Sequence, residues 1–441
     1  MAMKATKSRK GGSKAAQTAT PKTTSPTAKT LRIPITNVFD GTDYSAQILI
    51  GSQQVAANVI LDTGSSTLAV VPSVYQAAQD TDMKPTSLAQ QVLYGTGAWI
   101  GPIVNTRLAL GDPAGDTVTL QSAPIAVTMV QAKDNFTGVD GIMGLAYLSL
   151  NKAYDLQSYL AHHKINPPVT FPWPFPSANF ANSWKQFSEL TKTPGVASTS
   201  VAPYFMEMET QGLTLNKFAF YTLRSWVRYA TANKTAIASD PLNNGFFILG
   251  GGEEQTDLYS GDFVNVDVLH DIYYNTNLIS IQVDGCPPVN AKPLQPEYKG
   301  AGSNCIVDTG TNPLVLSNDV FRAVIQSLEK VNPKFINLIQ QAQQNGISSS
   351  LLDLAEWPGI SFILTGDTGQ PVKLTCAPQT YWQEDFPAPG QAVFQIAPAG
   401  SKDPVNQSIL GLPLMNNYYT VFDRSLGAGN GIIRFAPIKQ P

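Results

Sequence analysis

The sequence has little cysteine: Cys286, Cys305 and Cys376 are the three in 441 residues. An odd count without a C-x-x-C pair excludes a disulfide framework and a cysteine-based structural zinc site. We therefore expect free thiols and a reducing compartment. A bond between Cys286 and Cys305, which lie close in the sequence, is the alternative.

Histidine and long apolar runs are scarce as well. His162, His163 and His270 are too few and too scattered for a metal cluster, so we expect no metal and no other cofactor. No apolar run is long enough to span a bilayer, and the N-terminus lacks the apolar core of a secretory signal. These absences favour a cytoplasmic protein that makes no membrane contact.

Acidic residues are missing from the first thirty positions, which hold seven Lys or Arg among Ser, Thr, Ala, Gly and Pro. This composition predicts a disordered basic tail over 1–30, with an organelle import signal as the alternative. The rest of the chain has 22 basic and 32 acidic residues, a net charge of about −10. Because so acidic a body repels polyanions, we expect no nucleic-acid partner.

What the chain does contain is typical of many short strands joined by turns. Hydrophobic residues make up 43% and charged residues 14%, with 34 Gly and 32 Pro. This predicts a mostly β protein, and the length exceeds what one core normally holds. We expect an N-terminal β lobe over 31–225 and a C-terminal β lobe over 226–441. A Pro- and aromatic-rich stretch, about 155–200, is expected to be a long loop or insertion that covers a lobe or lines a binding edge.

Two segments have the pattern of helices. "SWKQFSELTK" follows the aromatic stretch, and "SNDVFRAVIQSLEKVN" begins at Ser317, a residue type that caps helix N-termini well. In the second segment Val320, Phe321, Val324 and Ile325 fall on one helical face.

One motif occurs twice. Residues 59–71 read "VILDTGSSTLAVV" and residues 305–317 read "CIVDTGTNPLVLS". Each copy is followed later by two apolar residues and a glycine, in "VDGIMGLAY" from Val139 and in "QSILGLPLM" from Gln407. Two matched pairs in the same order predict an ancient duplication in which each half supplies one aspartate, Asp62 and Asp308.

A carboxylate after a buried strand is costly unless it has a partner, although a lone aspartate in this context is more often a turn residue. Two carboxyls at hydrogen-bonding distance share one proton and titrate as a coupled pair. The charged member can then take a proton from a water while the protonated member donates to a substrate carbonyl. We therefore predict that Asp62 and Asp308 catalyse amide hydrolysis by activated water.

The remaining motif residues are assigned supporting or binding roles. Backbone N–H groups of Gly64 and Gly310 can donate to the carboxylates, and both glycines allow close approach of the substrate. The hydroxyl groups are predicted to act in two pairs: Ser65 and Thr311 on the outer carboxylate oxygens, and Thr63 and Thr309 as links between the two loops.

From about Leu31 to its end the chain resembles the pepsin-like aspartic proteases. The resemblance rests on both D-T-G motifs, on "YGTGAWIG", which is similar to the flap hairpin of that family, and on "ILGLPLMNNYYTVFDR". It implies a bilobal fold of two related antiparallel β lobes with a cleft between them. It also implies a monomeric endopeptidase that is active at acidic pH, cleaves polypeptides beside large hydrophobic residues and binds pepstatin-like inhibitors. A catalytically silent peptide- or protein-binding homologue is the alternative.

The resemblance also assigns binding residues. Tyr94 matches the flap tyrosine, Gly95 and Thr96 match positions whose backbone binds peptide, and Ile60 and Ile142 match a pocket for the residue before the scissile bond.

The chain departs from the digestive pepsins beside the first motif. It has Ala69 where they carry Trp, and Trp99 follows the flap instead, an arrangement similar to the memapsin branch. Trp99 is therefore the candidate hydrogen-bond partner of Tyr94. In lacking a recognisable secretory signal, the chain resembles the leaderless bacterial homologues of the family.

Overall fold

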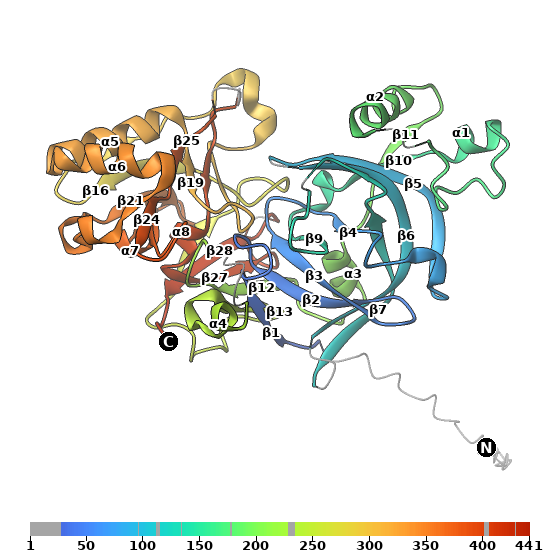
Figure 1. Ribbon diagram of the computed structural model, residues 1–441, viewed down its shortest axis with the longest axis horizontal. Coiled ribbons are helices and arrows are strands. Elements are labelled where there is room, and N and C mark those ends of the chain that lie inside the picture. Colours follow the sequence, from blue (N-terminus) through green and yellow to red (C-terminus); the bar gives the residue numbers. More distant parts are fainter. Residues whose placement is uncertain are drawn as a thin grey trace, which may run out of the picture.

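The computed structural model describes residues 28–95, 97–111, 115–133, 135–176, 179–227, 234–400, 405–427 and 429–441. Strands dominate, and they form two lobes joined by a shared sheet (Figure 1). The predicted mostly β, bilobal fold is confirmed. The predicted tail lies outside the described residues except at its last three positions, and the proposed boundary at 225/226 stays a prediction.

The N-terminal lobe is built on one continuous, highly twisted sheet. Its order is β11-β10-β5-β6-β7-β4-β9-β3-β2-β1, with β8 paired to β6. The strands are β1 (Leu31–Thr36), β2 (Ser45–Ile50), β3 (Val55–Asp62), β4 (Leu68–Val70), β5 (Lys84–Leu93), β6 (Ala98–Gly111), β7 (Thr117–Val127), β8 (Val130–Gln131), β9 (Gly141–Gly144), β10 (Lys152–Asp155) and β11 (Ala197–Ser200).

The same sheet continues into strands from the second half of the chain. β1 pairs in antiparallel register with β13, from Leu31 opposite Leu249 to Thr36 opposite Asn244. The order then runs β13-β12-β27-β28-β14. These strands are β12 (Lys217–Tyr221), β13 (Asn244–Leu249), β14 (Val264–Asp267), β27 (Tyr418–Asp423) and β28 (Ile432–Pro437). This shared sheet joins the two lobes, and its strands β1, β12, β13, β27 and β28 lie between and below them in the view of Figure 1.

Three smaller sheets make up the C-terminal lobe. The first sheet has the order β15 (Asn275–Thr276), β18 (Cys305–Val307), β26 (Ser408–Leu410), β19 (Leu314–Leu316) and β25 (Ile396–Pro398). The second has the order β17 (Val289–Asn290), β16 (Leu278–Val283), β21 (Ile360–Thr365) and β22 (Pro371–Cys376). The third has the order β20 (Ile347–Ser348), β24 (Gln391–Phe394) and β23 (Trp382–Glu384). The three cysteines are buried and free, as expected.

Most helices lie on the outside of the lobes, whereas α3 and α8 are packed among the strands (Figure 1). They are α1 (Gln157–His162), α2 (Phe180–Leu190), α3 (Tyr204–Thr210), α4 (Lys234–Ser239), α5 (Asn318–Val331), α6 (Lys334–Asn345), α7 (Pro378–Tyr381) and α8 (Leu412–Met415). Both predicted helices are confirmed as α2 and α5. In α5, Val320 and Val324 are buried, but the Ser317 side chain makes no capping hydrogen bond.

The aromatic stretch is more ordered than a loop. It forms α1 and α2, and β11 pairs with β10. Phe187 and Leu190 of α2 pack into a buried cluster with Ile100 of β6. The prediction of a long loop was therefore wrong in detail, because these apolar side chains bury themselves against the sheet. The prediction that they cover a lobe is confirmed.

The duplicated motif produces the same local topology in each lobe. β3 pairs in parallel with β9 and β18 pairs in parallel with β26, while β4 and β19 return antiparallel to β9 and β26. The glycine of each later segment lies under a D-T-G loop. A Cβ on Gly144 would lie 2.4 Å from the Ser66 nitrogen, and one on Gly411 would lie 2.1 Å from the Thr311 oxygen. Backbone packing thus requires glycine at both positions.

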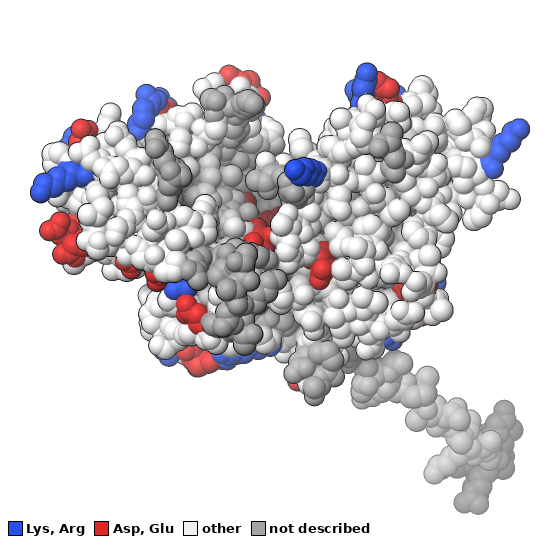
Figure 2. Space-filling view, in the orientation of Figure 1, with Lys and Arg blue, Asp and Glu red and all other residues white. Residues whose placement is uncertain are grey.

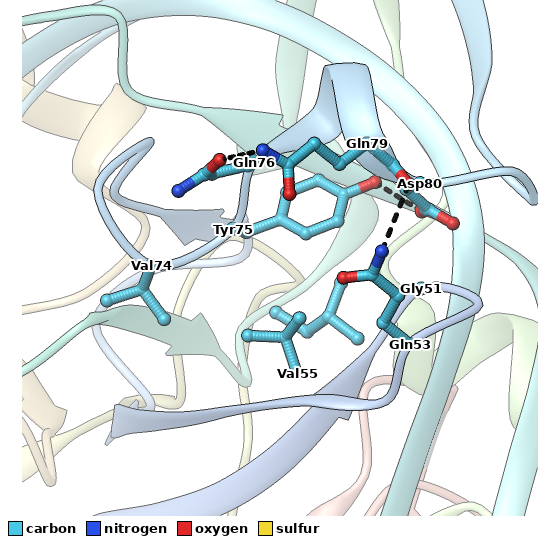
Figure 3. A pocket seen from close by; sticks show the side chains of 9 residues that line it. Gly51, Gln53, Val55, Val74, Tyr75, Gln76, Gln79 and Asp80 are labelled. Carbon is cyan, nitrogen blue, oxygen red and sulfur yellow. Dashed lines mark hydrogen bonds between the residues drawn. The ribbon is translucent and has the colours of Figure 1, made fainter.

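A small cavity at the outer edge of the N-terminal lobe is organised around Asp80 (Figure 3). The Asp80 carboxylate accepts hydrogen bonds from the hydroxyls of Tyr75 and Thr106 and from the backbone nitrogens of Ser52 and Asp82. Partial burial raises the pKa of Asp80, but these hydrogen bonds outweigh it and lower the pKa to about 2. Because four protein donors already bind the Asp80 carboxylate, it is not available to a ligand. We therefore assign Asp80 a structural role.

Asp80→Asn tests that role. A depressed pKa stabilises the fold above the unfolded-state pKa, but Asp80 is only partly buried, so solvent screens part of the effect. The variant should lose about 1–2 kcal/mol of unfolding free energy at pH 7. The difference from the parent should shrink as the pH falls from about 4 through about 2. Urea denaturation in an Asp62→Asn background, which avoids self-digestion, measures it. Asp82→Asn, an exposed neighbour, is the control, and equal losses in both variants would contradict the assignment.

Candidate active site

The two D-T-G loops meet at the junction of the lobes and bind each other symmetrically. The Thr63 nitrogen donates to Thr309 Oγ1 and the Thr309 nitrogen donates to Thr63 Oγ1, both at 2.9 Å. Each hydroxyl also donates to a strand carbonyl of the opposite lobe: Thr309 to Leu61 at 2.8 Å and Thr63 to Val307 at 3.2 Å. All four bonds are buried and cross between the lobes, so they fix the positions of the adjacent aspartates relative to each other.

The glycines of the loops bring backbone against carboxylate. Gly64 N–H donates to Asp62 Oδ1 at 2.7 Å and Gly310 N–H donates to Asp308 Oδ1 at 2.9 Å. A Cβ on Gly64 would lie 2.7 Å from Asp308 Oδ2, and one on Gly310 would lie 2.4 Å from Asp62 Oδ1. Each glycine therefore donates a hydrogen bond to the aspartate of its own loop, and its lack of a side chain leaves space for the aspartate of the other loop.

The electrostatics of the pair are asymmetric. Asp308 accepts a second hydrogen bond, from Thr311 Oγ1 to Oδ2 at 2.7 Å. Burial and the neighbouring Asp308 carboxylate raise the pKa of Asp62 well above its usual value, and the Gly64 N–H opposes this shift. Ser65 lies near enough to lower that pKa as well, but its buried hydroxyl makes no hydrogen bond of good geometry. Asp308 thus has the better-stabilised negative charge.

A cleft of about 760 Å³ opens above the pair. Its lining includes all seven of the sequence-predicted binding residues that the structure describes: Ile60, Gly64, Tyr94, Gly95, Ile142, Gly310 and Thr311. In Figure 2, acidic side chains lie in the hollow between the lobes. Thr96, predicted at the flap tip, lies outside the described residues.

The hairpin of β5 and β6 reaches over the space between the lobes (Figure 1). Its turn is closed by a bond from the Tyr94 nitrogen to the Gly97 oxygen at 2.7 Å. Trp99 is fully buried and its Nε1 donates to the Tyr94 hydroxyl at 3.2 Å. Ala69 and Trp99 belong to one buried cluster, so the indole packs beside the small residue of the first motif. The predicted contact between Trp99 and Tyr94 is confirmed.

Comparison with known proteins decides the family. A family model described as "Eukaryotic aspartyl protease" matches residues 43–165 and 231–437. The chain belongs to the eukaryotic aspartyl protease family. It is 26% identical over 424 residues to cathepsin E from Aquarana catesbeiana, covering 92% of this chain and 81% of the relative. It is 24% identical over 411 residues to pepsin-2B from Gadus morhua, covering 90% and 96%. The protein is an aspartic-type endopeptidase and acts on polypeptides.

This aspartyl protease has further acidic groups in its cleft that the sequence did not single out. Asp40 and Asp43 line the cleft with Asp62 and Asp308, and no lining residue in the described part of the chain is Lys or Arg. Burial, then the charges of Asp40, Asp62 and Asp308, raise the pKa of Asp43. Its Oδ1 is buried without a hydrogen-bond partner. In the sequence, Asp43 could have been noticed as an acidic residue directly before the strand that starts after Tyr44. However, the sequence does not show which strand ends face the cleft.

Among the described residues, no group of His, Cys, Asp and Glu is arranged to hold a metal ion. No helix in the described ranges has the length and apolar character needed to cross a bilayer.

Thr309→Val tests the link between the loops. It keeps the volume but removes the hydroxyl, leaving the Thr63 N–H and the Leu61 carbonyl buried without partners. The unfolding free energy should fall by about 2–3 kcal/mol. Thr222→Val is the matched control, because the Thr222 hydroxyl is buried and already lacks a partner, so its loss should cost nothing. Both are measured by urea denaturation in the Asp62→Asn background, and a Thr309→Val cost no larger than the control's would refute the link.

Proposed function

We propose that this aspartyl protease hydrolyses peptide bonds through a water activated by Asp62 and Asp308. The observation that supports this is the buried carboxyl pair with unequal hydrogen bonding. Asp308 accepts bonds from Gly310 and Thr311, so it is the charged member, whereas the raised pKa of Asp62 makes it the protonated one.

Each carboxyl then has one task. Asp308 takes a proton from the water, and the water oxygen bonds to the substrate carbonyl carbon. Asp62 donates its proton to the carbonyl oxygen, which removes the charge that develops there. The C–N bond breaks as Asp308 passes the proton it took from the water to the amine nitrogen, and Asp62 regains a proton from a hydroxyl of the tetrahedral intermediate as the new carboxyl group forms. No covalent enzyme intermediate forms.

The cleft favours an extended polypeptide with large apolar side chains. Ile60, Ile142, Ile306 and Ile409 line it from both lobes. Leu93, at the end of β5, is 73% exposed and completes an apolar surface beside the flap turn. Backbone groups of the flap can pair with an extended substrate, as in other strand-addition complexes.

Asp62→Asn should abolish cleavage. The loss should be at least about 10³-fold in kcat, because the acid of the pair is removed. Above neutral pH the same variant should be more stable than wild type, because it no longer forces a buried carboxyl to ionise. Peptide cleavage followed by mass spectrometry and urea denaturation measure the two effects. Cleavage by the variant at the parental rate would refute the mechanism, and a wild type inert at every pH would instead indicate a silent peptide-binding homologue.

The pH profile follows from the same proton. Activity should be highest on the acidic side and fall with single-proton slope as the pH rises through the upper apparent pKa of the pair. Because burial and the Asp308 charge raise the Asp62 pKa, the midpoint of that fall should lie above the usual pKa of an aspartate. The measurement is kcat/KM with a peptide containing a Phe-Phe bond. Activity that stays flat through alkaline pH would contradict the single-proton model.

The acidic cleft predicts a charge preference. Peptides carrying Lys near the scissile bond should be cleaved about tenfold better than matched peptides carrying Glu. Asp43→Asn should reduce this ratio by about threefold or more at the least acidic pH at which cleavage is still measured, because burial and the neighbouring carboxylates raise the pKa of Asp43 and the side chain is charged only above that pKa. Asp262→Asn, the same charge change at an exposed position outside the cleft, is the control. A ratio unchanged by Asp43→Asn would remove Asp43 from substrate recognition.

Three further properties complete the proposal. We expect a monomer that binds pepstatin-like inhibitors across both aspartates. A cytoplasmic location also remains a proposal, with organelle import as its alternative. The free, buried thiols are compatible with a reducing interior, and burial raises the pKa of both Cys305 and Cys376 to about 12, which keeps them unreactive.

A further inference from the structure

A second cavity, of about 400 Å³, lies behind the flap hairpin. One wall is formed by Ile100 of β6 and Val130 of β8, and the opposite wall by Phe187 and Leu190 of α2. In Figure 1, α2 lies on the outer side of the β5 and β6 strands. The cavity shares no lining residue with the catalytic cleft.

Aromatic rings of the insertion shape the cavity. Trp173 lies edge-on to Phe175 with ring centres 5.0 Å apart, and it stacks with Phe187 at 6.1 Å. Tyr159 of α1 continues the series, 6.2 Å from Phe175. The family match stops at residue 165 and resumes at 231, so most of this wall belongs to the part of the chain that the family model does not match.

One polar group in this wall is unsatisfied. Ser183 of α2 is 8% exposed, lines the cavity, and its hydroxyl has no hydrogen-bond partner. Leaving a buried hydroxyl unpaired costs about 1–3 kcal/mol, so the position is unfavourable unless something completes it. A ligand atom in the cavity would supply the missing partner after a small rotation of the side chain.

We propose that this cavity binds a small uncharged aromatic molecule of two or three rings that shares a hydrogen bond with Ser183. The volume falls in the range of about 300–1,000 Å³ that small-molecule sites occupy. No Lys or Arg is among the described lining residues, and the one lining carboxylate, Glu189, is at an exposed position. The buried part of the wall therefore offers ring contacts and the unpaired Ser183 hydroxyl, whereas the other polar lining side chains are at partly or fully exposed positions: Tyr159, Gln186, Glu189 and Thr193.

The site also contacts the flap. Gln91 of β5 donates to the Trp184 carbonyl at 2.9 Å and to the Ser188 hydroxyl at 2.8 Å, which ties the hairpin to α2. Ile100, in the cavity wall, directly follows Trp99, which holds Tyr94. An occupant therefore lies against the outer side of the hairpin that covers the catalytic pair.

The test is a fluorescence titration with N-phenyl-1-naphthylamine, an uncharged three-ring amine whose emission rises in apolar surroundings. The full chain carrying Asp62→Asn is used, so that the result does not depend on cleavage. We expect saturable one-to-one binding. Trp173→Ala should weaken it at least about tenfold and Ser183→Ala about three- to tenfold. Gln186→Trp, at an exposed rim position, should weaken binding by filling the cavity without disturbing the core.

Tyr273→Ala, in the catalytic cleft, is the matched control and should leave the titration unchanged. Weakening by Tyr273→Ala with no effect of Trp173→Ala or Gln186→Trp would place the probe in the cleft and overturn the proposal. Absence of saturable binding would overturn it as well. Tighter binding of the anionic analogue 1-anilinonaphthalene-8-sulfonate than of the uncharged amine would overturn the assigned ligand class.

Discussion

The structure depends on holding two carboxyl groups together in a place where water reaches them poorly. Burial and mutual repulsion oppose two charges there, so the fold must supply rigid geometry and hydrogen bonds in return. The reciprocal bonds between Thr63 and Thr309 supply the geometry, and the N–H groups of Gly64 and Gly310 supply donors. Since one aspartate comes from each lobe, every strand that aligns the lobes serves this contact.

Two aspartates show how differently the same side chain is used. Asp80 is only partly buried and accepts four hydrogen bonds, so it stays ionised in acid and holds the edge of the lobe. Asp62 is buried beside another carboxyl with fewer donors, so it keeps its proton. Under the proposed mechanism the pair works with one proton at acidic pH, so the enzyme also needs structural carboxylates of the first kind to keep its fold at that pH.

The repeated motifs could be interpreted from the sequence, whereas features that depend on contacts between distant segments could not. The doubled D-T-G motif and the later glycines identified the pair and the lobes, because their backbone constraints are local and recur. The contact between Trp99 and Tyr94 could be predicted from the family resemblance, because the chain has Ala69 where the digestive pepsins carry Trp and has Trp99 after the flap instead. Asp43 was missed since only the folded sheet brings it beside Asp62 and Asp308. Within the 155–200 stretch the pattern of α2 was recognised, but α1 was missed because it spans only six residues beside proline-rich sequence.

The flap hairpin lies between the cleft that holds Asp62 and Asp308 and the second cavity formed by the insertion. Along β6 successive side chains point to opposite faces, so Trp99 faces the catalytic side and packs with Ala69 while Ile100 faces the insertion and packs with Phe187. One strand therefore carries both the residue that holds Tyr94 and the wall of the second cavity. Because α2 also packs against β5 and is hydrogen-bonded to it through Gln91, the insertion and the flap hairpin share one set of contacts.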